Sequence, residues 1–402
     1  MTTTDNISTA GRIPAEFEDI APYDDSQYRS KIAALLAEPG FEHAVRYVYP
    51  NVDYPRFAQE LLKVNNQHDF QYNVMGPFLE MLVKHTTAGL SCDGLENIAP
   101  GQSYTFITNH RDIVLDASFL NLCFIRNRMP LTQVAIGNNL LIYDWITDLV
   151  KLNRSFIVKR DVRIVDALNA ARHLSAYIHY VINERNESVW IAQREGRAKD
   201  SNDLTQESLV KMLGLAPAED DVRGNLLGAH LLPVSISYEY DPNDYLKARE
   251  FLLRRRDPAY KKSQHDDLFS METGILKYKG RVHFRVGMPV NGELELFGGT
   301  TRNELVKETC RLIDKAIHCG YHIFPCNYIA YDKVEDTRRF AAYYTAGDEQ
   351  QFNEYINRQL DRVDVPDVTA DEREYMRGMI LAMYANPLKN QIAAGGVCDE
   401  AF

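Results

Sequence analysis

Apolar residues in the first part of the chain recur three or four positions apart, which is the spacing of one helix face. Three such groups follow one another: Ile32 with Leu35 and Leu36, Phe57 with Leu61 and Leu62, and Phe78 with Met81 and Leu82. Pro39 and Gly40 lie between the first two groups and predict a break between helices. The pattern therefore predicts an N-terminal helical region over residues 1–86, in which residues 1–25 form a polar lead that is disordered or orders on contact.

The middle of the chain, residues 87–333, alternates between short apolar runs and helical periods. The clearest helix is expected over Asp161–Arg185. Such alternation predicts an α/β domain, in which a mixed sheet is covered by helices. Residues 334–402 become helical again, with helices expected over 340–360 and 371–385 and a frayed end after Ala393. The predicted strands are Tyr104–Thr108, Thr132–Ile136, Phe156–Val158, Val189–Ala192, Leu231–Ser237 and Val282–Val286.

Composition narrows the class of protein. Of the 402 residues, 45% are hydrophobic and 25% are charged, as in folded soluble proteins. The formal net charge of −11 argues against a nucleic-acid partner. No apolar run approaches the roughly 20 residues that span a bilayer, and the N-terminus lacks a basic-then-apolar signal, so we expect a cytoplasmic protein. The six cysteines show no metal-ligand spacing and are expected to be reduced.

One segment departs from this acidic balance. Basic residues between Lys247 and Lys262 surround Phe251-Leu252-Leu253. This pattern suits a peripheral membrane-docking segment. It equally suits a solvated helix face, and the sequence does not choose between the two.

One turn carries the candidate chemistry. Asn109-His110-Arg111-Asp112 follows a predicted buried strand and precedes an apolar stretch, Ile113–Ile125, that is long enough for a helix. His110 is therefore expected at a strand-to-helix turn, where a side chain can face a cleft. Asp116 lies a short way into the helix and can return to the imidazole. A histidine oriented by a carboxylate is a general base for a hydroxyl or an amine.

Three further blocks follow downstream. They are Ser155–Arg160, an apolar strand that ends in the basic pair Lys159-Arg160; Glu195-Gly196-Arg197 after a second apolar strand; and Leu231–Ile236, a strand that contains Pro233. Together with the His110 turn, these blocks resemble the four motifs of the glycerol-phosphate and lysophosphatidate (1-acylglycerol-3-phosphate) acyltransferase family, in family order. The resemblance implies a glycerolipid acyltransferase-like core.

Two departures mark a divergent member of that family. Five residues, Arg111 to Leu115, separate His110 from Asp116, which is one more than the family usually has. Asp112 is therefore the alternative partner of the imidazole. In the third block Arg194 stands in place of the usual proline, and no residue separates Gly196 from Arg197. This leaves open which residues contact a phosphate, and the acceptor itself could differ.

The resemblance assigns a role to each block. His110 would be the general base, and Asp116 would fix its tautomer. The cations Lys159, Arg160 and Arg197, with Arg111 as a further candidate, would hold a phosphate, and Glu195 and Gly196 would shape the turn that presents Arg197. The donor would be acyl-CoA or acylated carrier protein, and the acceptor a hydroxyl of a phosphate-bearing lipid precursor, glycerol 3-phosphate or a lysophospholipid. No metal or organic cofactor is expected. The protein would lie at the inner face of the cell membrane.

Three alternatives remain open. The acceptor could be a hydroxyl or amine of an amino-acid lipid. Water could replace the acceptor, which would make the protein a thioesterase or ester hydrolase that uses the same histidine and aspartate. A lipid or carrier-protein binder without catalysis is the third possibility, and the intact pair of His110 and Asp116 argues against it.

Overall fold

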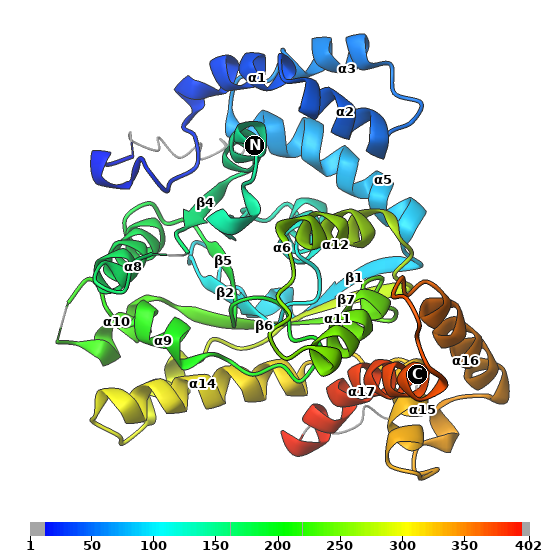
Figure 1. The fold of residues 1–402 in the computed structure, drawn as a ribbon. Helices are drawn as coiled ribbons and strands as arrows, with labels where there is room; N and C mark the ends of the chain where they lie inside the picture. Colours follow the sequence, from blue (N-terminus) through cyan, green and yellow to red (C-terminus); the bar gives the residue numbers. More distant parts are fainter. Residues whose placement is uncertain (1–12, 161, 219, 396–402) are drawn as a thin grey trace, which may run out of the picture.

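The computed structural model describes residues 13–160, 162–218 and 220–395. A seven-stranded mixed sheet lies at its centre (Figure 1), in the order β1-β7-β6-β2-β5-β3-β4. Strands β2 to β6 run parallel, whereas β7 pairs antiparallel with β6 and parallel with β1. The strands are β1 (Gly89–Asp93), β2 (Thr105–Thr108), β3 (Gln133–Gly137), β4 (Ser155–Val158), β5 (Val189–Ala192), β6 (Leu231–Tyr238) and β7 (Arg281–Val286).

Helices precede, separate and follow these strands. The N-terminal helices are α1 (Tyr28–Leu36), α2 (Pro39–Val48), α3 (Tyr54–Leu61), α4 (Gln67–Asp69) and α5 (Gly76–Thr86). Those of the central region are α6 (Leu115–Arg126), α7 (Asp144–Leu152), α8 (Ala167–Asn183), α9 (Glu207–Leu213), α10 (Val222–Gly228), α11 (Asp244–Arg256), α12 (Gln264–Leu276), α13 (Asn291–Leu296) and α14 (Arg302–Cys319). The C-terminal helices are α15 (Pro325–Val334), α16 (Ala346–Asp361) and α17 (Ala370–Ala393). Shorter turns are η1 (Ala15–Phe17), η2 (Asp25–Gln27), the π-helical η3 (Phe70–Met75), η4 (Leu95–Asn97), η5 (Asn138–Leu140) and η6 (Ala341–Tyr343).

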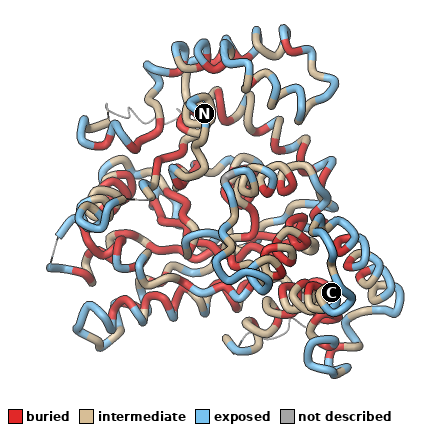
Figure 2. Tube along the Cα trace, in the orientation of Figure 1, coloured by how far each residue is buried: buried red, intermediate tan, exposed pale blue. Residues whose placement is uncertain are grey.

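The central strands β2, β5 and β6 are almost entirely buried, whereas the edge strand β1 is exposed or half-buried (Figure 2). Successive strand residues point to opposite faces. Ile107 and Ile191 therefore pack with α8, α9, α10 and α14 on one face, while Phe106 and Trp190 pack with α5 and α6 on the other. This arrangement confirms the predicted fold class, an α/β protein with a mixed sheet between helical layers and with helical N- and C-terminal regions.

The two helical regions have cores of their own. In the N-terminal region Tyr28, Ile32 and Leu35 pack with residues of α2, α3 and η3 and with Leu152 of α7. In the C-terminal region α15, α16 and α17 share a core with Leu252 of α11. The core of each helical region thus includes at least one side chain from the central region, so the three parts pack against one another.

The structure departs from the sequence pattern in three places. The edge strand β1 was not predicted, because Gly89–Asp93 lacks the β-branched and aromatic residues that mark strands. Helix α8 begins at Ala167 rather than Asp161, which lies outside the described residues. Residues 13–25 are packed rather than a loose lead, since Phe17 and Ile20 join the central core. Residues 1–12 and 396–402, also discussed from sequence, lie outside the described residues.

Candidate active site

The carboxyl ends of β2 and β5 lie side by side, level with the middle of β6. Thr108, the last residue of β2, is level with Ala192 of β5 and with Val234 of β6. The side chain of Asn109 then bridges to β6: its amide donates to the carbonyl of Ile236 at 3.0 Å and its oxygen accepts from the N–H of Ile236 at 2.8 Å. This double contact fixes the direction in which the chain leaves β2. Ligands of open α/β sheets bind at such strand ends.

His110 and Asp116 form a dyad at this edge. Nδ1 of His110 lies 2.8 Å from Oδ2 of Asp116, and the same oxygen accepts from the backbone N–H groups of Arg111 at 2.7 Å and Asp112 at 3.0 Å. An ionised carboxylate only accepts hydrogen bonds, so Nδ1 carries the proton and Nε2 is left with a free lone pair. The imidazole side chain is 13% exposed and that of Asp116 only 1%. Of the two carboxylates that the sequence left open, Asp116 is the one that contacts the ring.

Asp112 serves the start of helix α6 instead. Its Oδ1 accepts from the N–H groups of Val114 at 2.9 Å and Leu115 at 2.8 Å, and so satisfies amides that have no partner inside the helix. Its other oxygen lies against Gly274 of α12, where a Cβ atom would stand 1.9 Å away. Burial raises the pKa of the Asp112 carboxyl, and the charge of Asp116 raises it further. The additional residue of the first block therefore belongs to a capping turn.

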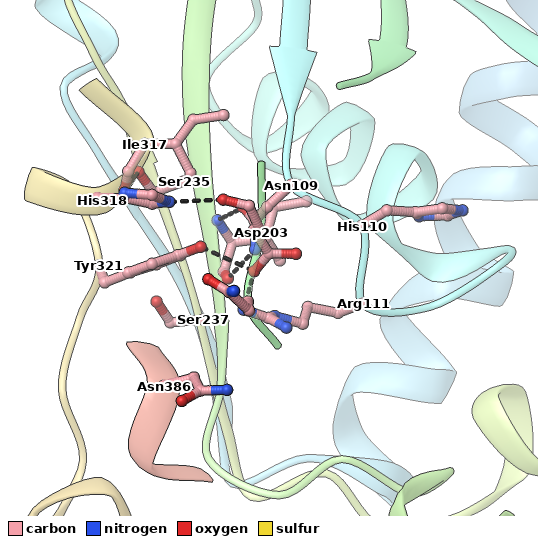
Figure 3. A network of polar contacts seen from close by, with 12 residues as sticks. Asn109, His110, Arg111, Asp203, Ser235, Ser237, Ile317, His318, Tyr321 and Asn386 are labelled. Carbon is pink, nitrogen blue, oxygen red and sulfur yellow. Dashed lines mark hydrogen bonds and ion pairs between the residues drawn. The ribbon is translucent and has the colours of Figure 1, made fainter. Parts of the chain in front are cut away.

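Arg111 is buried and turned away from the imidazole, as Figure 3 shows. Its Nη2 forms an ion pair with Oδ2 of Asp203, and the hydroxyl of Tyr321 donates to the same oxygen at 2.8 Å. Nη1 has no hydrogen-bond partner among the described residues. Arg111 was a candidate for phosphate binding, but here its charge is already matched by a carboxylate.

The remaining predicted cations differ in their partners. Arg160 forms an ion pair with the exposed Glu195, so the second and third blocks do meet at this edge. Lys159 pairs instead with Asp19 at 2.5 Å, in the segment that precedes helix α1. Arg197 is partly buried, and its Nη1 has no partner within the described ranges. Its charge reaches the His110 turn, since it opposes the rise that burial causes in the pKa of Asp112.

The loop after β5, which carries Glu195, Gly196 and Arg197, is held by hydrogen bonds between its two ends. Gly196 has a φ of 67°, a left-handed conformation that glycine adopts without strain. The N–H of Glu195 donates to the side chain of Gln206 at 2.7 Å, and the N–H of Gln206 donates to the carbonyl of Gln193 at 3.0 Å. Residues 193–206 therefore form a defined connection between β5 and α9, and this connection carries Arg197.

Sequence reasoning missed several polar groups around the dyad. The ring of Trp190 stands edge-on to His110, with centroids 5.9 Å apart. Burial and then the charge of Asp116 raise the pKa of Tyr238 well above its ordinary value. Within the described residues the indole N–H of Trp190 and both side-chain amide atoms of Gln193 are buried without hydrogen-bond partners. Of these residues only Trp190 lies in a predicted strand, and nothing in the sequence pattern showed that its ring contacts His110.

The basic segment at α11 is occupied by internal ion pairs. Lys247 is buried and forms an ion pair with Asp241. Arg254 pairs with Glu250 at 2.8 Å, and Arg256 pairs with Glu372 at 2.7 Å. Leu252, in the middle of the segment, belongs to the C-terminal core. Most of the positive charge that suggested a docking surface is therefore neutralised within the protein.

The described residues contain no cluster of three or more His, Cys, Asp or Glu side chains that could hold a metal ion. In that part of the chain no helix is both long and apolar enough to cross a membrane.

Fold and site together define an α/β protein with a histidine–aspartate dyad at the carboxyl edge of its sheet. No family model and no curated protein matches the chain. One solved structure that resembles it is the crystal structure of the 1-acyl-sn-glycerophosphate (LPA) acyltransferase PlsC from Thermotoga maritima, with 12% sequence identity over 73% of this chain and 93% of that chain. The TM-score is 0.34, and at this level the similarity assigns no function.

Proposed function

We propose that the protein is an acyltransferase that moves a fatty acyl group from a thioester, acyl-CoA or acylated carrier protein, to a hydroxyl of glycerol 3-phosphate or a lysophospholipid. The observation that carries this proposal is the dyad itself. His110 stands at the end of β2 with its Nδ1 held by Asp116, and the loop with Arg197 leaves the adjacent strand β5. The order of the four sequence blocks supports the same reading.

In the proposed reaction Nε2 of His110 removes the proton of the acceptor hydroxyl as its oxygen attacks the thioester carbonyl. Asp116 stabilises the imidazolium that forms, much as the acid does in a hydrolase triad. The tetrahedral intermediate then collapses, the carbon–sulfur bond breaks, and the departing thiolate takes the proton from His110. The products are the ester and a free thiol, and the dyad returns to its starting state.

Arg197 is the first candidate for the acceptor phosphate, because its charge lowers the pKa of Asp112 in the His110 turn and its Nη1 has no hydrogen-bond partner among the described residues. Arg160 is the second, since its guanidinium lies within reach of the same loop through Glu195. A phosphate would compete with Glu195 for Arg160, and Lys159 would have to leave Asp19. We leave Arg111 out of this set because Asp203 holds it.

That shortage of unpaired cations favours one second candidate, an acceptor without a phosphate. A hydroxyl or amine of an amino-acid lipid would need only His110 as base and an apolar site for its chain. Sulfate competition, described below, separates the two acceptor classes.

We also propose that the protein contacts the membrane through the connection between β4 and α8. Ile164 and Val165 are 95% and 77% exposed, and Leu168 is exposed beside them. This connection leaves the carboxyl end of β4, the same edge that carries His110. Exposed apolar side chains at a lipid enzyme's open edge suit insertion into a bilayer surface. The proposed location is the cytoplasmic face of the cell membrane.

The activity is tested by incubating the purified protein with labelled acyl-CoA or acylated carrier protein and a panel of acceptors, with products resolved by mass spectrometry. The panel contains glycerol 3-phosphate, lysophospholipids, amino-acid lipids and a blank with water alone. We expect a phosphate-bearing ester that forms with the native protein and not with His110→Ala. Release of free fatty acid in every sample, without transfer, would identify a hydrolase instead.

The membrane contact is tested separately by sedimentation with vesicles of phosphatidylcholine and phosphatidylglycerol. The double variant Ile164→Asp and Val165→Asp should lose most of its vesicle binding. Leu296→Asp is the matched control, because Leu296 is 88% exposed on α13, which follows the end of the antiparallel strand β7 at the opposite edge. Equal binding by both variants would place the contact elsewhere.

A further inference from the structure

Arg111 contacts two carboxylates: its backbone binds Asp116, and its side chain binds Asp203. Its backbone N–H donates at 2.7 Å to Oδ2 of Asp116, the oxygen that also holds the imidazole of His110. Its guanidinium, fully buried, is paired with Asp203. A displacement of the Arg111 side chain would therefore be transmitted to His110 and Asp116, because Arg111 makes both contacts.

Asp203 is itself fixed from the far side (Figure 3). Its Oδ2 accepts from the hydroxyl of Tyr321 at 2.8 Å, and its backbone carbonyl accepts from Nε2 of His318 at 2.7 Å. Two positions later, the N–H and hydroxyl of Thr205 donate to Asp314 of helix α14 at 2.7 and 2.6 Å. The segment that carries Asp203 is thus anchored on α14 and the residues just after it.

The same segment belongs to the connection between β5 and α9 that carries Arg197, six positions earlier. The ion pair between Arg111 and Asp203 is consequently a direct link between the turn with the base and the loop with the proposed phosphate ligand. Burial raises the pKa of the Asp203 carboxyl, and the guanidinium of Arg111 opposes this rise. A buried ion pair with this geometry sets position more than it adds stability.

We infer that Asp203 is a positioning residue of the reaction. By binding the guanidinium of Arg111, it fixes the position of the turn with His110 and Asp116 relative to the loop that carries Arg197. Asp203 does not touch the reacting atoms in this scheme. It acts through Arg111, and the inference rests on the proposed function for its kinetic consequences only. The chemical step depends on near-contact geometry, in which a shift of about 1 Å can cost on the order of 10²-fold in rate.

The kinetic test compares Asp203→Asn with Glu187→Gln. The first keeps the shape and one acceptor atom but removes the charge. The second removes the charge of Glu187, which accepts from Arg154 at 2.9 Å and from Arg185 at 2.7 Å in another ion-pair cluster. Glu187 lies just before the amino end of β5, and so at the opposite edge of the sheet. We expect kcat of Asp203→Asn to fall by about 10- to 100-fold, with both KM values changed less than about twofold. Glu187→Gln should keep kcat. An equal loss in both variants would reduce Asp203 to a merely structural role.

A second readout does not depend on turnover. In protein labelled with ¹⁵N-histidine, the Nδ1 proton resonance of His110, assigned by its absence in His110→Gln, reports the hydrogen bond to Asp116. It should broaden or exchange faster in Asp203→Asn and stay unchanged in Glu187→Gln. Arg111→Lys, which keeps the charge but loses the forked geometry, is made in parallel and should show the same change more weakly.

The outcomes separate the two proposals. An unchanged His110 resonance in Asp203→Asn, or in Arg111→Lys should the first variant not fold, overturns the positioning role. Absence of acyl transfer by the native protein, with the resonance changed as expected, overturns the proposed function and leaves the positioning role in place.

Discussion

Two aspartates in this protein each accept three hydrogen bonds, yet their surroundings differ. Asp116 receives the imidazole of His110 and two backbone amides at the open edge of the sheet. Asp244, at the start of α11, receives the hydroxyls of Tyr355 and Tyr384 at 2.7 and 2.8 Å and the amide of Gln359. The donors of Asp244 come from α16 and α17, so its carboxylate joins α11 of the central region to two helices of the C-terminal region.

The comparison shows that the number of hydrogen bonds does not decide what a carboxylate does. Asp244 is fully buried among neutral donors, and burial together with the charge of nearby Asp241 raises its pKa to about 7. Asp116 instead contacts the imidazole of His110, which is partly exposed at the edge of the sheet. Asp116 is therefore placed to orient that ring, whereas Asp244 links helices through neutral donors.

The largest expected effect comes from removing the base. His110→Ala should lower acyl transfer by at least about 10²-fold, because the acceptor hydroxyl loses the group that removes its proton. The melting temperature should change little, since Asp116 keeps its two backbone amides. Turnover is measured with the acceptor that gives product in the panel. Near-normal turnover in a folded His110→Ala protein would remove the imidazole from the mechanism.

The partner of the base is tested by a pair of variants. Asp116→Asn should lower kcat by about 10²- to 10⁴-fold, because the amide cannot stabilise the imidazolium or enforce its tautomer. Asp112→Asn should mainly cost stability, about 1 kcal/mol, through its contacts to the first amides of α6. Both are compared by kcat and by thermal melting. The reverse order of kcat losses would transfer the dyad to Asp112.

A smaller effect is expected at Arg197. Arg197→Lys should raise the KM of a phosphate-bearing acceptor about tenfold, the equivalent of one charge-assisted hydrogen bond of roughly 1.4 kcal/mol. The KM of the acyl donor should change much less. Inorganic sulfate should compete with the acceptor in the native protein. If sulfate does not compete and the acceptor KM stays constant, the acceptor without a phosphate becomes the better reading.

The smallest effect concerns the other carboxylate. Because the folded-state pKa of Asp244 is raised to about 7, the folded protein binds more protons than the unfolded chain between about pH 4 and pH 7. Its contribution to stability is therefore complete below about pH 4 and is lost as the pH rises through 7. Asp244→Asn, which imitates the protonated acid, should gain melting temperature relative to the native protein as the pH is raised from 5 to 8. Parallel curves for the two proteins would contradict the raised pKa.

Much of the fold follows from local pattern. The runs that form β2, β5 and β6 are apolar because both sheet faces are buried, and the turn after β2 was predicted to carry His110 for that reason. The choice between Asp112 and Asp116 did not follow, since the added residue lets either carboxylate return to the ring. Asp203 was beyond prediction, because it lies in a polar stretch and its partners Arg111 and Tyr321 are 92 and 118 positions away. Contacts of that separation leave no periodic trace in one sequence.

The close approach of Gly274 to Asp112 has a consequence for genetics. A Cβ atom at position 274 would stand 1.9 Å from a carboxylate oxygen of Asp112. Gly274→Ala therefore forces helix α12 away from the turn that carries His110 and Asp116. Because the added carbon presses on the turn that carries His110 and Asp116, the site should loosen before the chain unfolds. Such an allele would be conditional: the protein accumulates at low temperature and the cell loses its activity on warming. A methyl group in place of a single hydrogen atom would thus make the activity of this protein sensitive to temperature in living cells.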